Sequence, residues 1–333
     1  MTLMAQKYQK LIIGTNLLKR NRIMIKNLVI AGLLVVIAVL AFQRNDVSQQ
    51  AQLPTAESAE DKVVVLSTFT VIADMVSEIG GDKIDSRSIT KPGAEIHGYQ
   101  PTPSDLVQAQ DASIIFENGM NLELWTEKLR ASLPDVPVVR VSDGVEVINI
   151  SSDAYAGKPN PHAWMSPQQG LVYVENIRRE LTNILPEHEV YFRERAEDYS
   201  ARIQELDERL AATVADLPEN NRALVTCEGA FSYLANDYGL DEIYLWATNS
   251  DKQGTPQQVA RVIEEVNSRN IPAVFCESTV EPQLQSEVAA ATEAELGGLL
   301  YVDSLSEADG PATSYINLLE HTTNIIVAGL TKS

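Results

Sequence analysis

From Asp61 onward, short apolar segments rich in β-branched residues alternate with longer segments of helical periodicity. The apolar segments predict strands at 63–66, 84–89, 113–117, 136–141, 223–226, 242–246, 273–276 and 299–302. Helical periodicity predicts helices at 71–79, 103–110, 122–133, 255–270 and 281–295. Such alternation favours parallel sheets that are covered by helices on both faces. We therefore predict an α/β fold with two Rossmann-like lobes.

The middle of the chain follows a different pattern. Between residues 187 and 217, apolar side chains recur at intervals of three or four residues: Phe192, Ala196, Tyr199, Ile203, Leu206, Leu210, Val214 and Leu217. This spacing predicts one amphipathic helix, roughly 45 Å long at about 1.5 Å per residue. We interpret it as a rigid connection between lobes at 62–186 and 218–333; a coiled-coil partner is the alternative. Because α/β sheets bind ligands beyond the carboxyl ends of their strands, the site is expected in the cleft between the lobes.

The N-terminal segment has the pattern of an export signal. Residues 1–41 carry six Lys and Arg and no Asp or Glu, and basic residues precede the apolar stretch 28–42. Small residues near Ala41 suit cleavage there, whereas an uncleaved anchor is the alternative. Residues 42–61 have the composition of a linker. We expect a periplasmic protein, either released or tethered to the outer face of the inner membrane.

The charge of the exported part excludes one class of partner. The net charge is −20 for the whole chain, and removing the six positive charges of residues 1–41 leaves −26. Such a surface repels phosphate backbones, so no nucleic-acid partner is expected.

Two of the four histidines lie in proline-braced loops. His97 follows a predicted strand in KPGAEIHGYQPTPSDL, and His162 lies in KPNPHAWMSP. Stiff loops lose little entropy when they bind a ligand, so both histidines are candidate metal ligands. His188 and His321 stand on helical segments among polar neighbours, and we interpret them as surface residues.

Two carboxylates stand at predicted strand ends. Glu228 follows the strand ALVT, and Asp303 ends the strand segment YVD. As alternatives, Glu228 stabilises the first turn of a helix, and Asp303 is a helix cap or turn residue. Together with His97 and His162 they form a shell of nitrogen and oxygen donors with charge −2, which suits manganese, ferrous iron or zinc. Carboxylates that bind with one or two oxygens permit coordination above four, which favours manganese, although zinc binds most such sites more tightly.

The sequence lacks the common catalytic motifs. It contains no HExxH, phosphate-binding glycine loop, GxSxG or CxxC motif, and no spare general base is evident beside the proposed ligands. We therefore expect a binding protein rather than an enzyme. The alternatives from other classes are an exported metalloenzyme with histidine and carboxylate ligands, and a surface adhesin.

Five blocks of sequence carry a family resemblance: GAEIHGYQPTPSDL, NPHAWMSP, TCEGAFSYLANDYGL, GTPQQVARVIEEV and YVDSLSEADGPATSYINLLEHTTNIIVAGL. Over residues 62–330 the chain resembles the metal-specific solute-binding proteins of ABC importers, and among them the manganese receptors of cyanobacteria. The resemblance implies that His97, His162, Glu228 and Asp303 bind manganese(II). It also implies a monomer that delivers the ion to a membrane permease driven by a cytoplasmic ATPase.

The third ligand separates metals within that family. Zinc receptors usually have histidine there and a His/Asp-rich loop before the second ligand. This chain has Glu228, and residues 141–161 hold no histidine. Both features favour manganese or iron over zinc, which stays an alternative.

The two cysteines, Cys227 and Cys276, both lie in the exported part. An isolated pair outside the cytoplasm forms a disulfide more often than two free thiols. The family resemblance implies that they are bonded to each other. Because Cys227 adjoins Glu228, we expect reduction to weaken metal binding.

Overall fold

The computed structural model describes residues 62–133, 135–152, 155–248 and 254–331. The predicted signal or anchor at 1–41 and the predicted linker at 42–61 lie outside these residues. The described residues belong to one compact unit, Lys62–Ser333.

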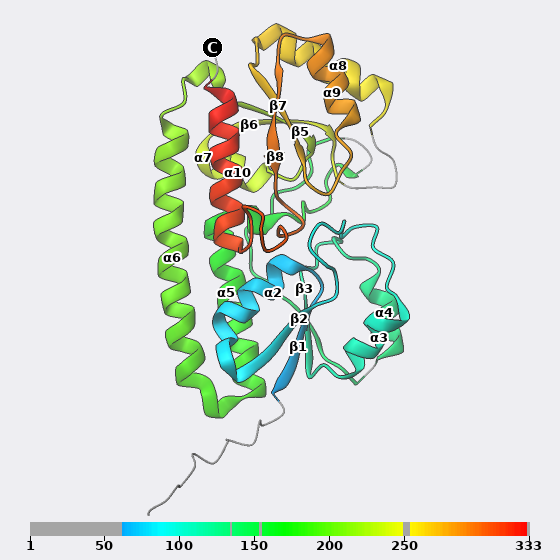
Figure 1. Ribbon diagram of the computed structural model, residues 1–333, viewed down its shortest axis with the longest axis vertical. Helices are drawn as coiled ribbons and strands as arrows, with labels where there is room; N and C mark the ends of the chain where they lie inside the picture. Colours follow the sequence, from blue (N-terminus) through cyan, green and yellow to red (C-terminus); the bar gives the residue numbers. More distant parts are fainter. Residues whose placement is uncertain (1–61, 134, 153–154, 249–253, 332–333) are drawn as a thin grey trace, which may run out of the picture. The chain divides into compact units, whose positions relative to one another are not determined.

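The first half of this unit contains a four-stranded parallel sheet. Its order is β2-β1-β3-β4, with β1 (Val63–Ser67), β2 (Ile84–Ser88), β3 (Ile114–Glu117) and β4 (Val138–Arg140). The sheet is accompanied by helices α2 (Thr70–Gly80), α3 (Pro103–Gln110) and α4 (Thr126–Ser132). In Figure 1, α2 lies on one side of the sheet and α3 and α4 on the other. All of β3 is buried, as expected for a central parallel strand.

The second half contains two pairs of parallel strands. β5 (Ala223–Glu228) pairs with β6 (Asp241–Trp246), and β7 (Ala273–Glu277) pairs with β8 (Glu295–Leu300). The helices here are α7 (Ser232–Tyr238), α8 (Pro256–Arg269), α9 (Gln283–Ala291) and α10 (Tyr315–Leu330). β5 also lies against β7, and the disulfide Cys227–Cys276 joins them. These parallel sheets with covering helices confirm the predicted α/β class.

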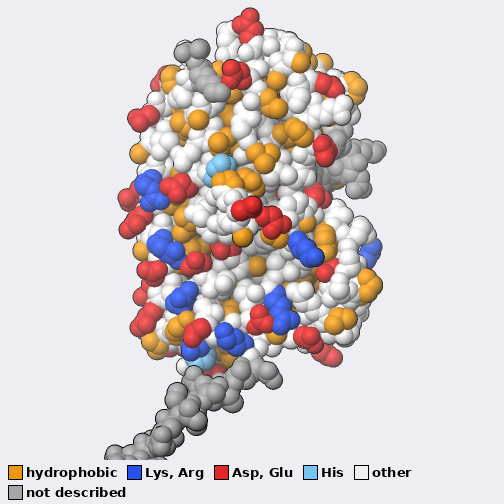
Figure 2. All heavy atoms as spheres, in the orientation of Figure 1, with side chains coloured by type: hydrophobic (Ala, Val, Ile, Leu, Met, Phe, Trp, Pro, Cys, Tyr) orange, Lys and Arg blue, Asp and Glu red, His pale blue; other side chains and the backbone are white. Residues whose placement is uncertain are grey.

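The long helix α6 (Glu189–Ala215) runs past both halves (Figure 1). Its buried residues are those that the periodicity predicted, from Phe192 to Val214. Helix α5 (Pro167–Ile184) packs along it, as do α2 and α10. On the face shown in Figure 2, Asp and Glu side chains are interspersed with Lys and Arg beside this helix. The division into lobes at 62–186 and 218–333, connected by 187–217, stays a prediction.

One hydrophobic core passes through both halves. It contains residues of the first sheet such as Phe116, residues along α6 such as Leu206, and residues of α10 such as Leu318. A second, smaller cluster lies between the strands β5 to β7 and the helices α8 and α9. The first core therefore joins the two sheet regions through packed side chains as well as through the chain itself.

Several predicted elements were incomplete or misplaced. Helix α5 was not predicted, and α10 was predicted only as a helical segment around His321, without bounds. The helix predicted at 281–295 ends at Ala291, and the one predicted at 122–133 covers only Thr126–Ser132. The last strand occupies Glu295–Leu300 rather than 299–302. It includes Gly297, where a Cβ atom would lie 2.4 Å from the ring of Phe275. The packing of Phe275 therefore requires glycine at position 297, although sequence patterns associate glycine with turns rather than with strands.

Within the described ranges, none of the helices combines the length and apolar character needed to cross a membrane.

Candidate metal centre

The four predicted ligands come from four separate segments and meet at one point. His97 lies between β2 and α3, and His162 directly precedes a 3-10 helix, Ala163–Met165, at the start of α5. Glu228 is the last residue of β5, and Asp303 follows β8. One donor atom from each residue lies within 4.8 Å of the others. The structure therefore brings together side chains that are up to 206 residues apart in the sequence (303 − 97).

The distances between donor atoms suit a single ion. The two histidine Nε2 atoms are 3.3 Å apart, and Glu228 Oε1 lies 3.5 Å from His97 Nε2 and 3.6 Å from His162 Nε2. The Asp303 oxygens lie 3.6 Å from His162 Nε2 and 3.9 Å from His97 Nε2. Ligands that hold an ion at about 2.1 Å in a tetrahedron are about 3.4 Å from one another. Only small shifts are needed to share an ion.

The centre is enclosed, with one side facing solvent. His162, Glu228 and Asp303 are at most 1% exposed, whereas the side chain of His97 is 7% exposed. Burial lowers the pKa of His97 to about 3, and burial together with the charge of His97 lowers that of His162 well below its usual value. Both imidazoles are thus neutral at physiological pH, which is the form that binds metals.

Asn160 orients the ring of His162. Its Oδ1 accepts hydrogen bonds from the backbone N–H of His162 (3.0 Å) and, at 2.8 Å, from Nδ1 of the ring when that nitrogen carries the proton. Its Nδ2 donates to the Gly229 carbonyl (2.6 Å) and to Ser232 Oγ (3.1 Å). A proton on Nδ1 leaves the Nε2 lone pair directed at the other three donors. Asn160 also ties the His162 segment to the segment that follows Glu228.

The loop that carries His97 is held by its own neighbours. The Glu95 carboxylate accepts hydrogen bonds from the backbone N–H groups of His97 and Gly98, both at 2.7 Å. The indole of Trp125 donates to the Ile96 carbonyl at 2.9 Å. The two peptide groups that flank His97 are therefore held by side chains.

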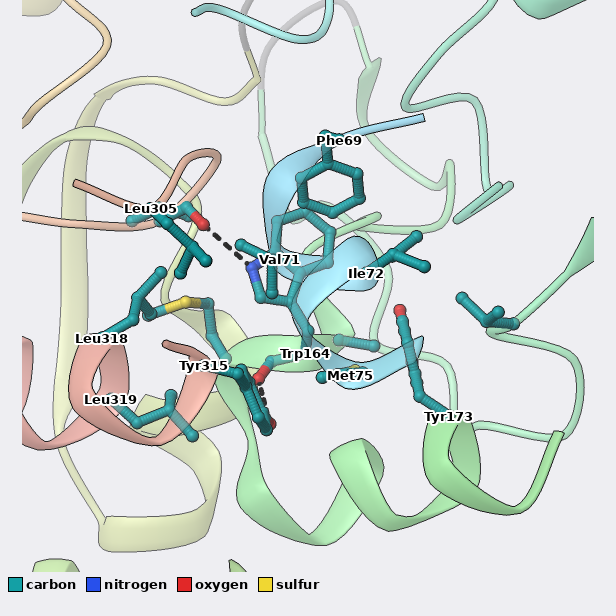
Figure 3. Packing of buried hydrophobic residues seen from close by; sticks show 14 of the residues in the cluster. Phe69, Val71, Ile72, Met75, Trp164, Tyr173, Leu305, Tyr315, Leu318 and Leu319 are labelled. Atoms are coloured by element: carbon teal, nitrogen blue, oxygen red, sulfur yellow. Dashed lines mark hydrogen bonds between the residues drawn. The ribbon is translucent and has the colours of Figure 1, made fainter. Parts of the chain in front are cut away.

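Asp303 lies beyond the strand rather than at its end, which corrects the predicted placement. It is three residues past Leu300, and α10 is capped by Ser314, so Asp303 is not a helix cap. The segment is held by the Trp164 indole, which donates to the Val302 carbonyl at 3.1 Å. Figure 3 shows Trp164 packed between Phe69, with ring centroids 5.1 Å apart, and Tyr315, whose hydroxyl donates to the Trp164 carbonyl at 2.7 Å.

Glu228 lies in a strand, not in the first turn of a helix, because α7 begins only at Ser232. Its backbone N–H faces both oxygens of the Glu277 carboxyl group at 3.3 Å. Burial raises the pKa of Glu277 to about 8, so neutral pH favours its uncharged form. The neighbouring disulfide between Cys227 and Cys276 confirms the implied pairing and means that neither sulfur is available as a thiolate ligand.

Sequence patterns located the four candidates but not the residues that hold them. Asn160 lies two positions before His162, and this spacing is the one local signal that could have identified it. Trp164 and Glu277 act on partners far along the chain, which periodicity does not reveal. The remaining histidines, His188 and His321, lie away from the centre, with rings against Phe192 and Tyr301 respectively.

Comparisons with known proteins point to one family. The family model described as zinc-uptake complex component A, periplasmic, matches residues 65–329. The chain is 48% identical over 268 residues to the iron-binding protein YfeA of Yersinia pestis, covering 80% of this chain and 86% of that protein. It is 31% identical over 278 residues to the manganese ABC transporter substrate-binding lipoprotein PsaA of Streptococcus mitis, covering 81% and 90%. The Mn-bound periplasmic metal-binding protein of Candidatus Liberibacter asiaticus shares the fold, with a TM-score of 0.75, 37% identity and coverage of 81% and 100%.

Proposed function

Because this chain belongs to the family of zinc-uptake complex component A, the periplasmic metal-binding components of ABC importers, we propose that it captures manganese(II) and delivers it to a membrane permease. Its ligands in this proposal are His97, His162, Glu228 and Asp303. The partners are a permease in the inner membrane and the cytoplasmic ATPase that drives it. The receptor acts as a monomer in the periplasm, free or tethered by its N-terminal segment.

One observation carries the proposal: four buried or nearly buried donors, two imidazoles and two carboxylates, lie within 4.8 Å of one another. Two ionised carboxylates without an ion repel each other in a buried site, and a divalent cation removes that cost. With neutral imidazoles the shell has charge −2 and neutralises the ion. The ion remains chemically unchanged, so capture requires no general acid, base or nucleophile.

The entry and exit of the ion follow from the exposure of the ligands. His97 is the ligand that reaches solvent, so the ion arrives and leaves on the His97 side. The core that passes from the first sheet along α6 to α10 opposes a wide hinge movement. Release is therefore a local rearrangement on the His97 side of the centre rather than a wide opening.

Manganese is favoured by the carboxylate at Glu228 and by the absence of sulfur ligands. Ferrous iron is the second candidate, because the 48% identical relative from Yersinia pestis is described as iron-binding. Zinc is the third, on the description of the family model. A metalloenzyme is disfavoured, because four protein ligands in an enclosed site leave few open coordination positions for a substrate.

The test is elemental analysis of protein isolated from the periplasm without added metal. Stoichiometric manganese is expected in the wild type, and its loss is expected in Glu228→Ala. Glu187→Ala, at an exposed glutamate, is the matched control and should retain the metal. Stoichiometric iron or zinc in the wild type would replace manganese as the cargo, and a metal-free wild type would refute the receptor function.

A further inference from the structure

Glu123 is a buried carboxylate outside the proposed ligand set. It lies between β3 and α4 and is 3% exposed. Its Oε1 accepts hydrogen bonds from the Thr68 hydroxyl (2.9 Å) and from the Asn118 N–H (2.6 Å), and its Oε2 accepts one from the Gly119 N–H (3.1 Å). Above its pKa of about 7, to which burial raises it, the carboxylate is ionised and purely an acceptor, which matches these three donors. Its contacts reach two segments that are about 50 residues apart (118 − 68).

The turn that Glu123 holds has an unusual backbone. Gly119, Met120 and Asn121 have φ angles of +85°, +52° and +64°. Methionine rarely adopts this left-handed conformation, so surrounding contacts must enforce it. The Glu123 carboxylate binds the two N–H groups at the beginning of the turn and thereby supplies such a contact.

The first segment held by Glu123 leads to His162. Asn118 is fully buried, and its Nδ2 donates to the carbonyl of Pro161 at 3.0 Å. Its Oδ1 accepts a hydrogen bond from the Tyr173 hydroxyl. Because Pro161 directly precedes His162, a shift of the turn is transmitted to the position of that ring.

The second segment held by Glu123 leads to Asp303. Next to Thr68, Phe69 packs edge-on against Trp164, whose indole holds the Val302 carbonyl. One residue further, the Thr70 hydroxyl accepts a hydrogen bond from the Leu305 N–H at 2.9 Å. The segment that begins at Thr68 thus contacts the chain directly at Leu305 and, through Trp164, at Val302, on the two sides of Asp303.

We propose that Glu123 is a positioning residue that fixes the segments carrying His162 and Asp303 in the geometry that binds the ion. It touches neither ligand and acts through Asn118 on one side and through Thr68 to Thr70 on the other. The inference rests on the proposed metal-receptor function and adds a determinant of affinity that lies outside the ligand set.

The test compares manganese(II) binding by the wild-type protein and by Glu123→Gln. The glutamine amide would direct an N–H at a backbone N–H or at the Thr68 hydroxyl, so at least one hydrogen bond is lost. We expect about 10-fold weaker manganese(II) affinity, as is typical for residues that orient metal ligands. We also expect an altered zero-field splitting in the electron paramagnetic resonance spectrum of bound manganese(II), since that quantity reports ligand geometry.

Two further variants separate positioning from general destabilisation. Thr68→Val removes one hydroxyl at nearly constant volume and should weaken manganese(II) affinity about 3-fold. This variant keeps the test valid if Glu123→Gln does not fold. Glu117→Gln is the matched control, because Glu117 is equally buried on β3 but its carboxylate faces Thr126, Arg130 and Arg140. It should lower the melting temperature and leave affinity and spectrum unchanged.

The outcomes distinguish this inference from the proposed function. A wild-type protein that binds no manganese(II), ferrous iron or zinc would refute the receptor function itself. The role of Glu123 alone would be overturned by a different result. In that case the wild type binds manganese(II), and Thr68→Val and any folded Glu123→Gln have the same affinity and spectrum as the wild type. An equal loss in Glu117→Gln would overturn it as well, because any buried carboxylate would then have the same effect.

Discussion

The side chain of Asn160 uses all of its hydrogen-bonding groups at the proposed metal centre. Its oxygen faces the backbone and the ring of His162, and its amide donates to Gly229 and Ser232. Such residues set the tautomer and direction of a ligating histidine, so their effect exceeds that of an ordinary buried hydrogen bond.

Replacing Asn160 tests this role. We expect Asn160→Ala to weaken manganese(II) binding by about 10- to 100-fold, because the His162 ring loses the acceptor that fixes it. Asn160→Asp retains an acceptor for the ring and should bind more tightly than the alanine variant. Asn183→Ala, at an exposed position of α5, is the control. Isothermal titration calorimetry measures the three affinities, and equal affinity of the alanine variant and the wild type would contradict this role.

Single residues also mark where sequence analysis succeeds and where it fails. His97 and His162 could be identified from the sequence because proline-braced loops form a local pattern. Glu228 could be identified because it ends a recognisable strand. Glu123 could not be identified from the sequence, because its importance comes from a contact with Thr68, 55 residues away, and from a left-handed turn that no local motif predicts. The ligand role of the four candidates stays a prediction that the geometry supports.

The elements show the same division between local and distant causes. The helix α6 follows directly from its apolar periodicity, since one buried stripe is enough to specify it. The strand β8 does not, because Gly297 is required by the ring of Phe275 on the neighbouring strand β7. Packing against a distant residue decides such a boundary, whereas periodicity reports only local pattern.

Strands β5 and β7 are joined beside the metal centre by the disulfide Cys227–Cys276, whose Cα atoms are 4.9 Å apart. Each cysteine directly precedes a glutamate, Glu228 on β5 and Glu277 on β7, and these glutamates contact each other. The covalent bond therefore fixes the spacing of two strands from which one proposed ligand projects.

Removing this disulfide should affect both stability and binding. We expect the double variant Cys227→Ala/Cys276→Ala to lose about 2–4 kcal/mol of unfolding free energy. We also expect weaker manganese(II) affinity, because Glu228 is less firmly placed. Chemical denaturation and calorimetry measure the two effects, with reduction of the wild type as an independent comparison. Unchanged affinity after complete reduction would show that the bond contributes to stability alone.

The unit as a whole contains several buried ionisable groups whose effects on stability oppose one another. Burial raises the pKa of Glu123 and Glu242 to about 7 and that of Glu277 to about 8. Burial lowers the pKa of His97 to about 3 and shifts His162 in the same direction. In the metal-free protein these groups make the free energy of unfolding depend on pH in two ways.

Without metal, we expect the free energy of unfolding to fall as pH rises from about 5 to about 8. Over this range the folded protein holds protons on the three glutamates, and in the lower part of the range also on Asp74, whose pKa burial raises to about 6, whereas the unfolded chain has released most of these protons. The two histidines, which the unfolded chain protonates below about pH 6.5 and the folded protein does not, reduce this slope in the lower part of the range but are outnumbered there by the carboxyl groups.

Thermal unfolding from pH 5 to 8, with a chelator present, measures this profile. Glu242→Gln should flatten the decline between pH 5 and 8, because it removes one of the three glutamates. A melting temperature that rises steadily from pH 5 to 8 would contradict the expected profile.

The core shared along α6 has a consequence for how the permease recognises the receptor. A receptor that cannot close widely has nearly the same surface shape with and without the bound ion. Discrimination by the permease would then depend on the small area around His97, and unloaded copies would compete for the same docking position. We therefore expect surplus receptor to slow uptake when the ion is scarce.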